Sequence, residues 1–184
     1  MTLGKFRNFD VEVFRDDLFS MNSTDNANSY SFQYIEDKRS STKIGVRLLD
    51  EQYEVVVSAI LGGSRGITGV HPACGLVDND NVLLCVSNNV YCLELPSLKL
   101  LWRTDADEAT CFEICGIPDG YIVHGELRLS RLDKSGRVVW SRLGADIFTT
   151  PYGKDEFEVA DGVIKVLDWN GTLYRFDLDG KPLS

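Results

Sequence analysis

Short runs of alternating hydrophobic and polar residues fill most of this chain, and turns rich in Asn, Asp, Gly and Pro separate them. Alternation with a period of two is typical of β-strands that bury one face. From residue 73 onward the runs form three units of four strands, and the last strand of the third unit is short. The predicted strands are 73–77, 82–87, 90–95 and 98–103, then 110–115, 121–125, 127–132 and 137–142, then 156–160, 163–168, 172–176 and 181–184.

The first 72 residues show a weaker version of this pattern. They contain strand candidates at 11–14, 30–35, 44–49 and 53–61, and the charged stretch 36–41 separates the second from the third. A helix over 51–60 fits the pattern only moderately worse than a strand. We therefore expect a single domain over residues 1–184, in which a degenerate N-terminal segment or blade at 1–72 precedes three blade-like repeats at 73–184.

The three regular units repeat one short phrase. It reads Val-Tyr-Cys-Leu-Glu at 90–94, Leu-Ser-Arg-Leu-Asp at 129–133 and Leu-Tyr-Arg-Phe-Asp at 173–177. A basic residue follows each phrase, and the strand after it carries Trp102 in the first unit and Trp140 in the second. A strand repeat with a period of about 40 residues is typical of blade-type architectures. The equivalent positions of the two tryptophans predict that both pack between blades.

This phrase resembles the pyrroloquinoline-quinone-like repeat of β-propellers, whose blades carry Val-Tyr-Ala-Leu-Asp and then Gly-Lys-x-x-Trp, and more broadly it resembles WD-type repeats. Leu98 stands where the first unit would have the turn glycine. The resemblance implies a propeller-like binding platform. It implies no quinone cofactor, because the chain has room for about four blades where such propellers usually have seven or eight. We expect an all-β fold, a small or partial β-propeller-like array of antiparallel blades.

The third unit lacks its tryptophan. The equivalent position is Ser184, and the short strand at 181–184 contains Pro182, which cannot donate a hydrogen bond to a sheet. An open sheet edge invites pairing with another strand. We expect residues 11–14 to cover this edge; a second copy of the chain, forming a homo-oligomer, or a strand of a partner is the alternative.

Composition narrows the class of partner. Of 184 residues, 43% are hydrophobic, and 28 acidic against 19 basic residues give a net charge of −9. Such a surface repels nucleic acid and anionic membranes and favours a basic or neutral protein partner. No apolar stretch has secretory or membrane-spanning length, and the odd number of cysteines, 5, fits reduced thiols, so we expect a cytoplasmic location.

One segment suggests an enzyme. Gly62-Gly63-Ser64-Arg65-Gly66 fits the nucleophile elbow of hydrolases, and with the next residue it looks like the phosphate loop of short-chain dehydrogenases. Both motifs require a helix directly after the loop, whereas the following residues 67–72 are β-branched, broken by glycine and ended by proline. We interpret the segment as a connector into the first regular blade.

The cysteines and histidines offer little chemistry. Cys111 and Cys115 are four apart, which places them on one face of a strand, but only two histidines are present and no zinc motif is completed. If Asn88-Asn89 is a two-residue hairpin loop, Cys85 lies opposite Cys92 as a pair of reduced thiols. We predict no catalytic residue, no metal site and no cofactor.

These observations favour a binding protein over an enzyme. The most specific hypothesis is a cytosolic inhibitor of the immunity or antitoxin type that neutralises a basic partner such as a nuclease toxin. The alternatives are a regulatory or assembly scaffold for neutral partners and a hydrolase that uses Ser64. The acidic loop residues proposed to bind the partner are Asp78, Asp80, Asp105, Asp107 and Glu108.

Overall fold

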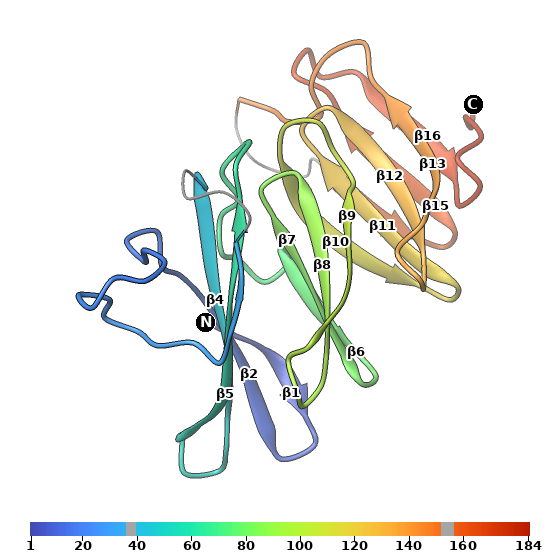
Figure 1. Cartoon of the computed structure of the whole chain (residues 1–184). Helices are drawn as coiled ribbons and strands as arrows, with labels where there is room; N and C mark the ends of the chain where they lie inside the picture. Colours follow the sequence, from blue (N-terminus) through green and yellow to red (C-terminus); the bar gives the residue numbers. More distant parts are fainter. Residues whose placement is uncertain (36–39, 152–156) are drawn as a thin grey trace.

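The computed structural model describes residues 1–35, 40–151 and 157–184, and this part of the chain is all-β, without a helix (Figure 1). Residues 36–39 of the charged stretch at 36–41 lie outside these ranges, as does residue 156, at which a strand was predicted to begin. The strands are β1 (Thr2–Phe6), β2 (Phe9–Arg15), β3 (Phe32–Tyr34), β4 (Thr42–Leu49), β5 (Val55–Gly63), β6 (Gly75–Asp78), β7 (Asn81–Val86), β8 (Asn89–Glu94), β9 (Leu100–Asp105), β10 (Cys111–Ile117), β11 (Gly120–Gly125), β12 (Arg128–Asp133), β13 (Val138–Leu143), β14 (Phe157–Ala160), β15 (Val163–Leu167) and β16 (Leu173–Asp177).

The strands form four sheets in chain order. Their orders are β1-β2-β4-β5-β3, then β6-β7-β8-β9, then β10-β11-β12-β13, then β14-β15-β16. Every pair of neighbouring strands is antiparallel except β3 and β5. The expected all-β, propeller-like array of antiparallel blades is therefore confirmed.

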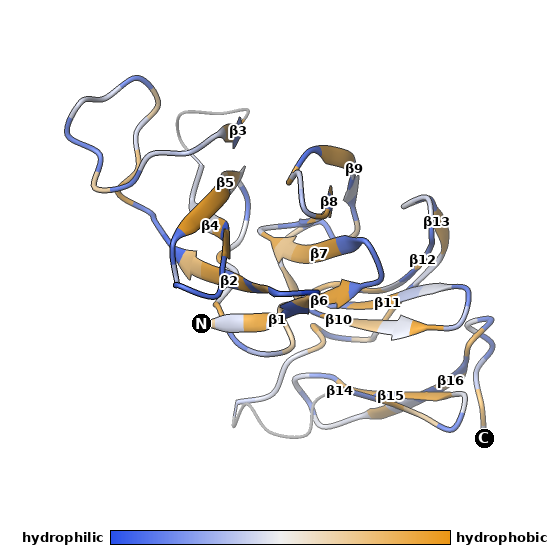
Figure 2. Ribbon diagram, turned by 90° about the horizontal axis from the view of Figure 1, so that it is seen from below, coloured by the Kyte–Doolittle hydropathy of each residue, from blue (hydrophilic) through white to orange (hydrophobic). Residues whose placement is uncertain are grey.

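Each sheet packs its apolar face on the next sheet along the chain. The first core joins residues such as Ile44 and Leu61 of the first sheet to Leu84 of the second, and Figure 2 shows the apolar strands β4, β5 and β7 there. The next residue along, Cys85, faces the third sheet instead. After Asn81, strand β7 is apolar at every position from Val82 to Val86, which suits a strand with both faces buried.

The array is open. In Figures 1 and 2 the first and last sheets lie at opposite ends of the two middle sheets. The expectation that residues 11–14 cover the edge of the last sheet is wrong, because β2 lies between β1 and β4 in the first sheet. At the last edge, Pro182 forms an isolated bridge with Phe176, and the Leu183 N–H donates to the Arg175 carbonyl at 2.9 Å.

The N-terminal sheet is a more regular blade than the sequence suggested. Strands β1, β2, β4 and β5 follow one another as in the other sheets, and the insertion between β2 and β4 adds β3 at the outer edge. The segment at 53–61 is a strand, not a helix, although it begins later, at Val55. Strand β1 was not predicted, because Gly4 and Lys5 interrupt its apolar pattern.

The turn before the outermost regular strand repeats in all four sheets. The N–H groups of Asp50, Glu94, Asp133 and Asp177 donate to the carbonyls of Glu54, Lys99, Arg137 and Lys181 at 2.9–3.1 Å. The residue just before each acceptor is left-handed: Tyr53 (φ 62), Leu98 (φ 54), Gly136 (φ 81) and Gly180 (φ 74). The N-terminal sheet thus carries a fourth copy of the repeat that its sequence had concealed.

Both tryptophans pack between blades, as predicted. The ring of Trp102 lies on Gly136 of the next sheet, and the ring of Trp140 lies on Gly180, where an added Cβ would come within 2.8 Å of it. At Leu98, the equivalent position of the second sheet, the contact is made by Tyr34 of β3 and not by a tryptophan. The Tyr34 hydroxyl donates to the Leu98 carbonyl at 3.1 Å and accepts from the Leu100 N–H at 3.0 Å. The inserted strand β3 therefore supplies the side chain that covers Leu98.

Two cysteine predictions are wrong because local register differs from the simple alternation. A bulge between Cys111 and Glu113 leaves Cys111 buried and Cys115 partly exposed, so the two are not on one face. The β7–β8 hairpin turns one residue earlier than expected, at Ser87 (φ 58) and Asn88. Cys85 and Cys92 share a face without lying opposite each other, and all five cysteines are free thiols. The pairs are Val86 with Asn89, Cys85 with Val90 and Leu83 with Cys92.

Candidate functional site

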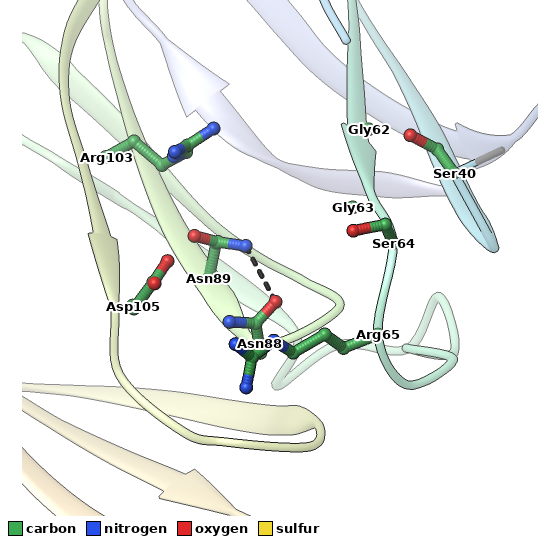
Figure 3. A pocket seen from close by; sticks show the side chains of 9 residues that line it. All are labelled: Ser40, Gly62, Gly63, Ser64, Arg65, Asn88, Asn89, Arg103 and Asp105. Atoms are coloured by element: carbon green, nitrogen blue, oxygen red, sulfur yellow. Dashed lines mark hydrogen bonds between the residues drawn. The ribbon is translucent and has the colours of Figure 1, made fainter. Parts of the chain in front are cut away.

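A polar pocket lies where the first two sheets meet, at the end of β5. Its volume is about 130 Å³ (Figure 3). The lining comes from Ser40, two residues before β4, from the end of β5 and the two residues after it, from the β7–β8 turn and the start of β8, and from β9. The lining residues are Ser40, Gly62, Gly63, Ser64, Arg65, Asn88, Asn89, Arg103 and Asp105.

Glycines allow the wall of this pocket to form. A Cβ on Gly63 would clash with the Ser87 side chain, so only glycine lets β5 approach the β7–β8 turn so closely. Past this point the Arg65 N–H donates to Ser87 Oγ at 2.9 Å, and Ser41 Oγ donates to the Arg65 carbonyl at 2.8 Å. No helix follows, and the segment predicted to be a connector is a connector, so Ser64 lacks the setting that either catalytic motif requires.

The floor of the pocket is a chain of amide hydrogen bonds. Asn88 Nδ2 donates to the Asp107 carbonyl at 3.5 Å, and Asn89 Nδ2 donates to Asn88 Oδ1 at 2.9 Å. These bonds fix which end of each amide is oxygen. Asn89 is 6% exposed, and its Oδ1 is a buried acceptor without a hydrogen-bond partner in the described structure. Leaving such an acceptor unpaired costs free energy, so the site suits a group that donates.

The charged lining residues differ in how they are engaged. Arg65 Nη1 donates to the Glu108 carbonyl at 2.9 Å, and the Arg103 guanidinium lies 5.9 Å from the centre of the Tyr91 ring. Asp105 is exposed at the end of β9, and no hydrogen bond or ion pair is formed by its carboxylate within the described residues. Asp105 is also the cross-strand partner of Asn89. The two free acceptors therefore lie side by side.

The five acidic residues proposed from the sequence do not form one patch. Asp78 and Asp80 lie at the β6–β7 turn, whereas Asp105, Asp107 and Glu108 lie at the end of β9 and just after it. The β7–β8 register places these groups at opposite ends of the second sheet. Of the five, the structure places one, Asp105, in the pocket.

Two of these acids stabilise the fold. Asp78 Oδ2 accepts from the Lys134 ammonium and the Tyr121 hydroxyl, each at 2.7 Å, and joins the second sheet to the third. The Lys134 hydrogen bond, helped by that from Tyr121, holds the pKa of Asp78 below its usual value. Asp107 is buried and accepts from four backbone N–H groups. The donors are Ala109 at 2.6 Å, Thr110 at 3.1 Å, Leu127 at 2.9 Å and Arg128 at 2.7 Å.

The other two acids pair with arginines. Asp80 Oδ1 lies 3.5 Å from Arg7 Nη2 in an exposed ion pair. Glu108 pairs with Arg128, and this contact is the largest cause of the lowered pKa of Glu108. Both carboxylates are exposed to solvent, and exposed pairs of this kind contribute little to stability.

Histidine and cysteine chemistry lies elsewhere. His124 is buried, with Nε2 2.8 Å from the Phe148 carbonyl and its ring stacked on Phe157. Among the residues that the structure describes, no group of three or more His, Cys, Asp or Glu is placed to hold a metal ion. The sequence had pointed to Ser64 and Asp105, but it assigned Asn88-Asn89 only to a turn and so missed the pocket's buried acceptor.

Comparisons with known proteins concern the fold. No family model matches this chain, and no curated protein sequence matches it. The computationally designed Ika8 protein is similar at a TM-score of 0.54 and 10% identity, over 82% of this chain and 47% of that one. The computationally designed Ika4 protein has a TM-score of 0.51 and 10% identity, over 64% of this chain and 76% of that one. The WD40 domain of Neurospora crassa Pan2 has a TM-score of 0.47 and 13% identity, over 58% of this chain and 34% of that one.

The comparisons and the sheet order together define the class. The chain has a propeller-like fold. At 10% identity, its likeness to the two designed structures concerns the architecture alone. It spans about half the length of Ika8 and about three quarters of Ika4. No helix long and apolar enough to cross a membrane occurs in the described ranges.

Proposed function

We propose that this chain is a non-catalytic protein-binding module, and that it binds a basic partner at the end of the blades where the Asn89 pocket opens. The observation that carries the proposal is the pocket itself. It presents the unpaired Asn89 Oδ1 beside the Asp105 carboxylate, and the described residues that line it include no histidine, lysine or cysteine to activate Ser64. Such a site accepts hydrogen bonds from a donor group, and among the residues that the structure describes no hydrogen bond joins Ser64 to a general base.

The fold and the charge are consistent with this function. A propeller-like fold is consistent with a non-catalytic protein-binding module, since loops at the ends of its blades are free to vary. The net charge of −9 favours a basic partner through long-range attraction. The most specific form of the proposal is a cytoplasmic inhibitor of the immunity or antitoxin type that neutralises a basic nuclease toxin.

The test is affinity capture from cell extract at low and at high salt, followed by mass spectrometry. We expect a basic protein whose affinity falls steeply as salt rises, because charge attraction is screened. Asp105→Asn should weaken capture, whereas Asp80→Asn, the same change at the opposite end of the sheet, should not. A partner whose binding does not depend on salt would support the assembly scaffold instead.

Two further results would decide between the specific forms. A gene for a basic toxin beside this one, and loss of that toxin's nuclease activity when the two proteins are mixed, would support the immunity role. Esterase activity that disappears in Ser64→Ala would contradict the non-catalytic reading and support a hydrolase.

A further inference from the structure

We propose that the pocket between the first two sheets binds a primary ammonium group, that of a lysine side chain on the partner. This inference rests on the proposed function, because it names the chemical group of the partner that binds at the end of the blades where the pocket opens. It is carried by three oxygen atoms with unused bonding capacity that line one small cavity. They belong to Asn89, Asp105 and Ser64.

A different element of the fold positions each of the three oxygens. Asn89 Oδ1 is oriented by the bond from Asn89 Nδ2 to Asn88, and it receives no hydrogen bond within the described structure. Asp105 is held opposite Asn89 by the β8–β9 register. Ser64 follows the Gly62-Gly63 pair that seats β5 on the hairpin, and Figure 3 shows its hydroxyl on the far side of the same space.

The number and type of these atoms match an ammonium ion. A lysine ammonium has three N–H donors and no acceptor, and here it would meet one carboxylate, one amide oxygen and one hydroxyl. Asp105 supplies the carboxylate for the ammonium, and the two guanidinium groups of the lining, Arg65 and Arg103, contact the Glu108 carbonyl and the Tyr91 ring. A divalent metal would demand more carboxylates than this pocket supplies, and the described residues contain no cluster of metal ligands.

The nearby arginines do not turn the pocket into an anion site. Arg65 directs Nη1 to the Glu108 carbonyl, and Arg103 lies against the Tyr91 ring. An ammonium head carries its three N–H donors on one atom, which suits three acceptors around one small space, whereas a planar guanidinium spreads its donors in a rigid fork. We therefore expect preference for lysine over arginine as well as over neutral side chains.

The direct test is a titration of the isotope-labelled chain, followed by nuclear magnetic resonance, with N-acetyl-lysine methylamide. The side-chain amide of Asn89 and the backbone amides of Ser64 and Arg65 should shift and saturate. N-acetyl-norleucine methylamide has the same stem without the charge and should shift none of them. N-acetyl-arginine methylamide should bind more weakly than the lysine probe; equal or tighter binding would overturn the proposal.

Variants at exposed positions avoid the risk of unfolding. Asp105→Asn should weaken lysine binding by at least about tenfold, because a charged hydrogen-bond partner becomes neutral. Ser64→Ala should weaken it by less, and Asp80→Asn should leave it unchanged. Shifts that are the same in Asp105→Asn and in the parent chain would show that the ammonium binds elsewhere.

This experiment can fail independently of the proposed function. If a basic partner is captured in a salt-dependent way but the lysine probe leaves Asn89 unshifted, the protein-binding role stands and the pocket assignment is wrong. If the probe saturates the pocket but extracts yield no basic partner, the pocket assignment stands and the proposed partner class is wrong.

Discussion

Asn89 and Asp105 lie directly opposite each other on β8 and β9, and one is buried while the other is open to solvent. Cross-strand neighbours have Cβ atoms about 5 Å apart, so an amide oxygen and a carboxylate without partners are forced together. In the middle of a sheet this arrangement would be costly. At the end of the blades, beside the pocket, the same arrangement offers two acceptors to a donor group from outside the chain.

Replacing Trp140 with alanine should lower the free energy of unfolding by about 3 to 5 kcal/mol, because the ring joins the third sheet to the fourth. The ring covers Gly180, and its Nε1–H donates to the Leu178 carbonyl at 3.0 Å. Urea unfolding followed by circular dichroism measures the change. Trp169→Ala is the matched control, since Trp169 is 47% exposed, and it should cost no more than about 0.5 kcal/mol. Equal losses in the two variants would contradict the inter-blade role of Trp140.

Two glycines with the same backbone conformation should respond differently to alanine. Gly180 and Gly162 have φ values of 74° and 75°, so Cβ strain of about 1 to 2 kcal/mol applies to both. At Gly162 an added Cβ meets nothing within 4 Å, whereas at Gly180 it meets the Trp140 ring at 2.8 Å. Gly180→Ala should therefore cost at least about 1 kcal/mol more than Gly162→Ala in thermal unfolding. If the costs are equal, Trp140 does not hold the neighbouring turn.

The sequence predicted the repeat well, because its alternation, turn residues and tryptophans all respond to local geometry. It could not show that Tyr34, from an inserted strand, covers Leu98, because that contact joins residues 64 apart and follows no period. It also misplaced the β7–β8 turn by one residue. Bonds from Arg65 and Cys111 to Ser87 hold that turn, and both donors come from other strands and loops. The pocket depends on that turn, so the sequence could name its residues but not bring them together.

The contact between Asp78 and Lys134 makes stability depend on acid pH. The folded-state pKa of Asp78 is lowered, so its contribution is present above the unfolded value of about 3.9 and is lost as pH falls through the folded value. Asp78→Asn should lower the melting temperature at pH 7, and the gap to the parent chain should close as pH falls below about 4. Asp80→Asn should show neither effect. A gap that stays constant from pH 7 to pH 2 would mean that the carboxylate charge is not what stabilises this contact.

Asp107 and Asp105 are two residues apart, yet Asp107 should matter for folding and Asp105 for binding. Asp107 satisfies four backbone N–H groups in two connections, and in Asp107→Asn an amide group would face two of those donors. We expect the free energy of unfolding to fall by about 2 to 4 kcal/mol, because buried donors lose a charged acceptor. Asp105→Asn should change stability by no more than about 0.5 kcal/mol, since its carboxylate is exposed and bonds to nothing in the described structure. Chemical denaturation of both variants, beside the lysine titration, separates the roles. If the Asp107→Asn variant is stable but does not bind the lysine probe, then Asp107, and not Asp105, is the aspartate that binds the ammonium group.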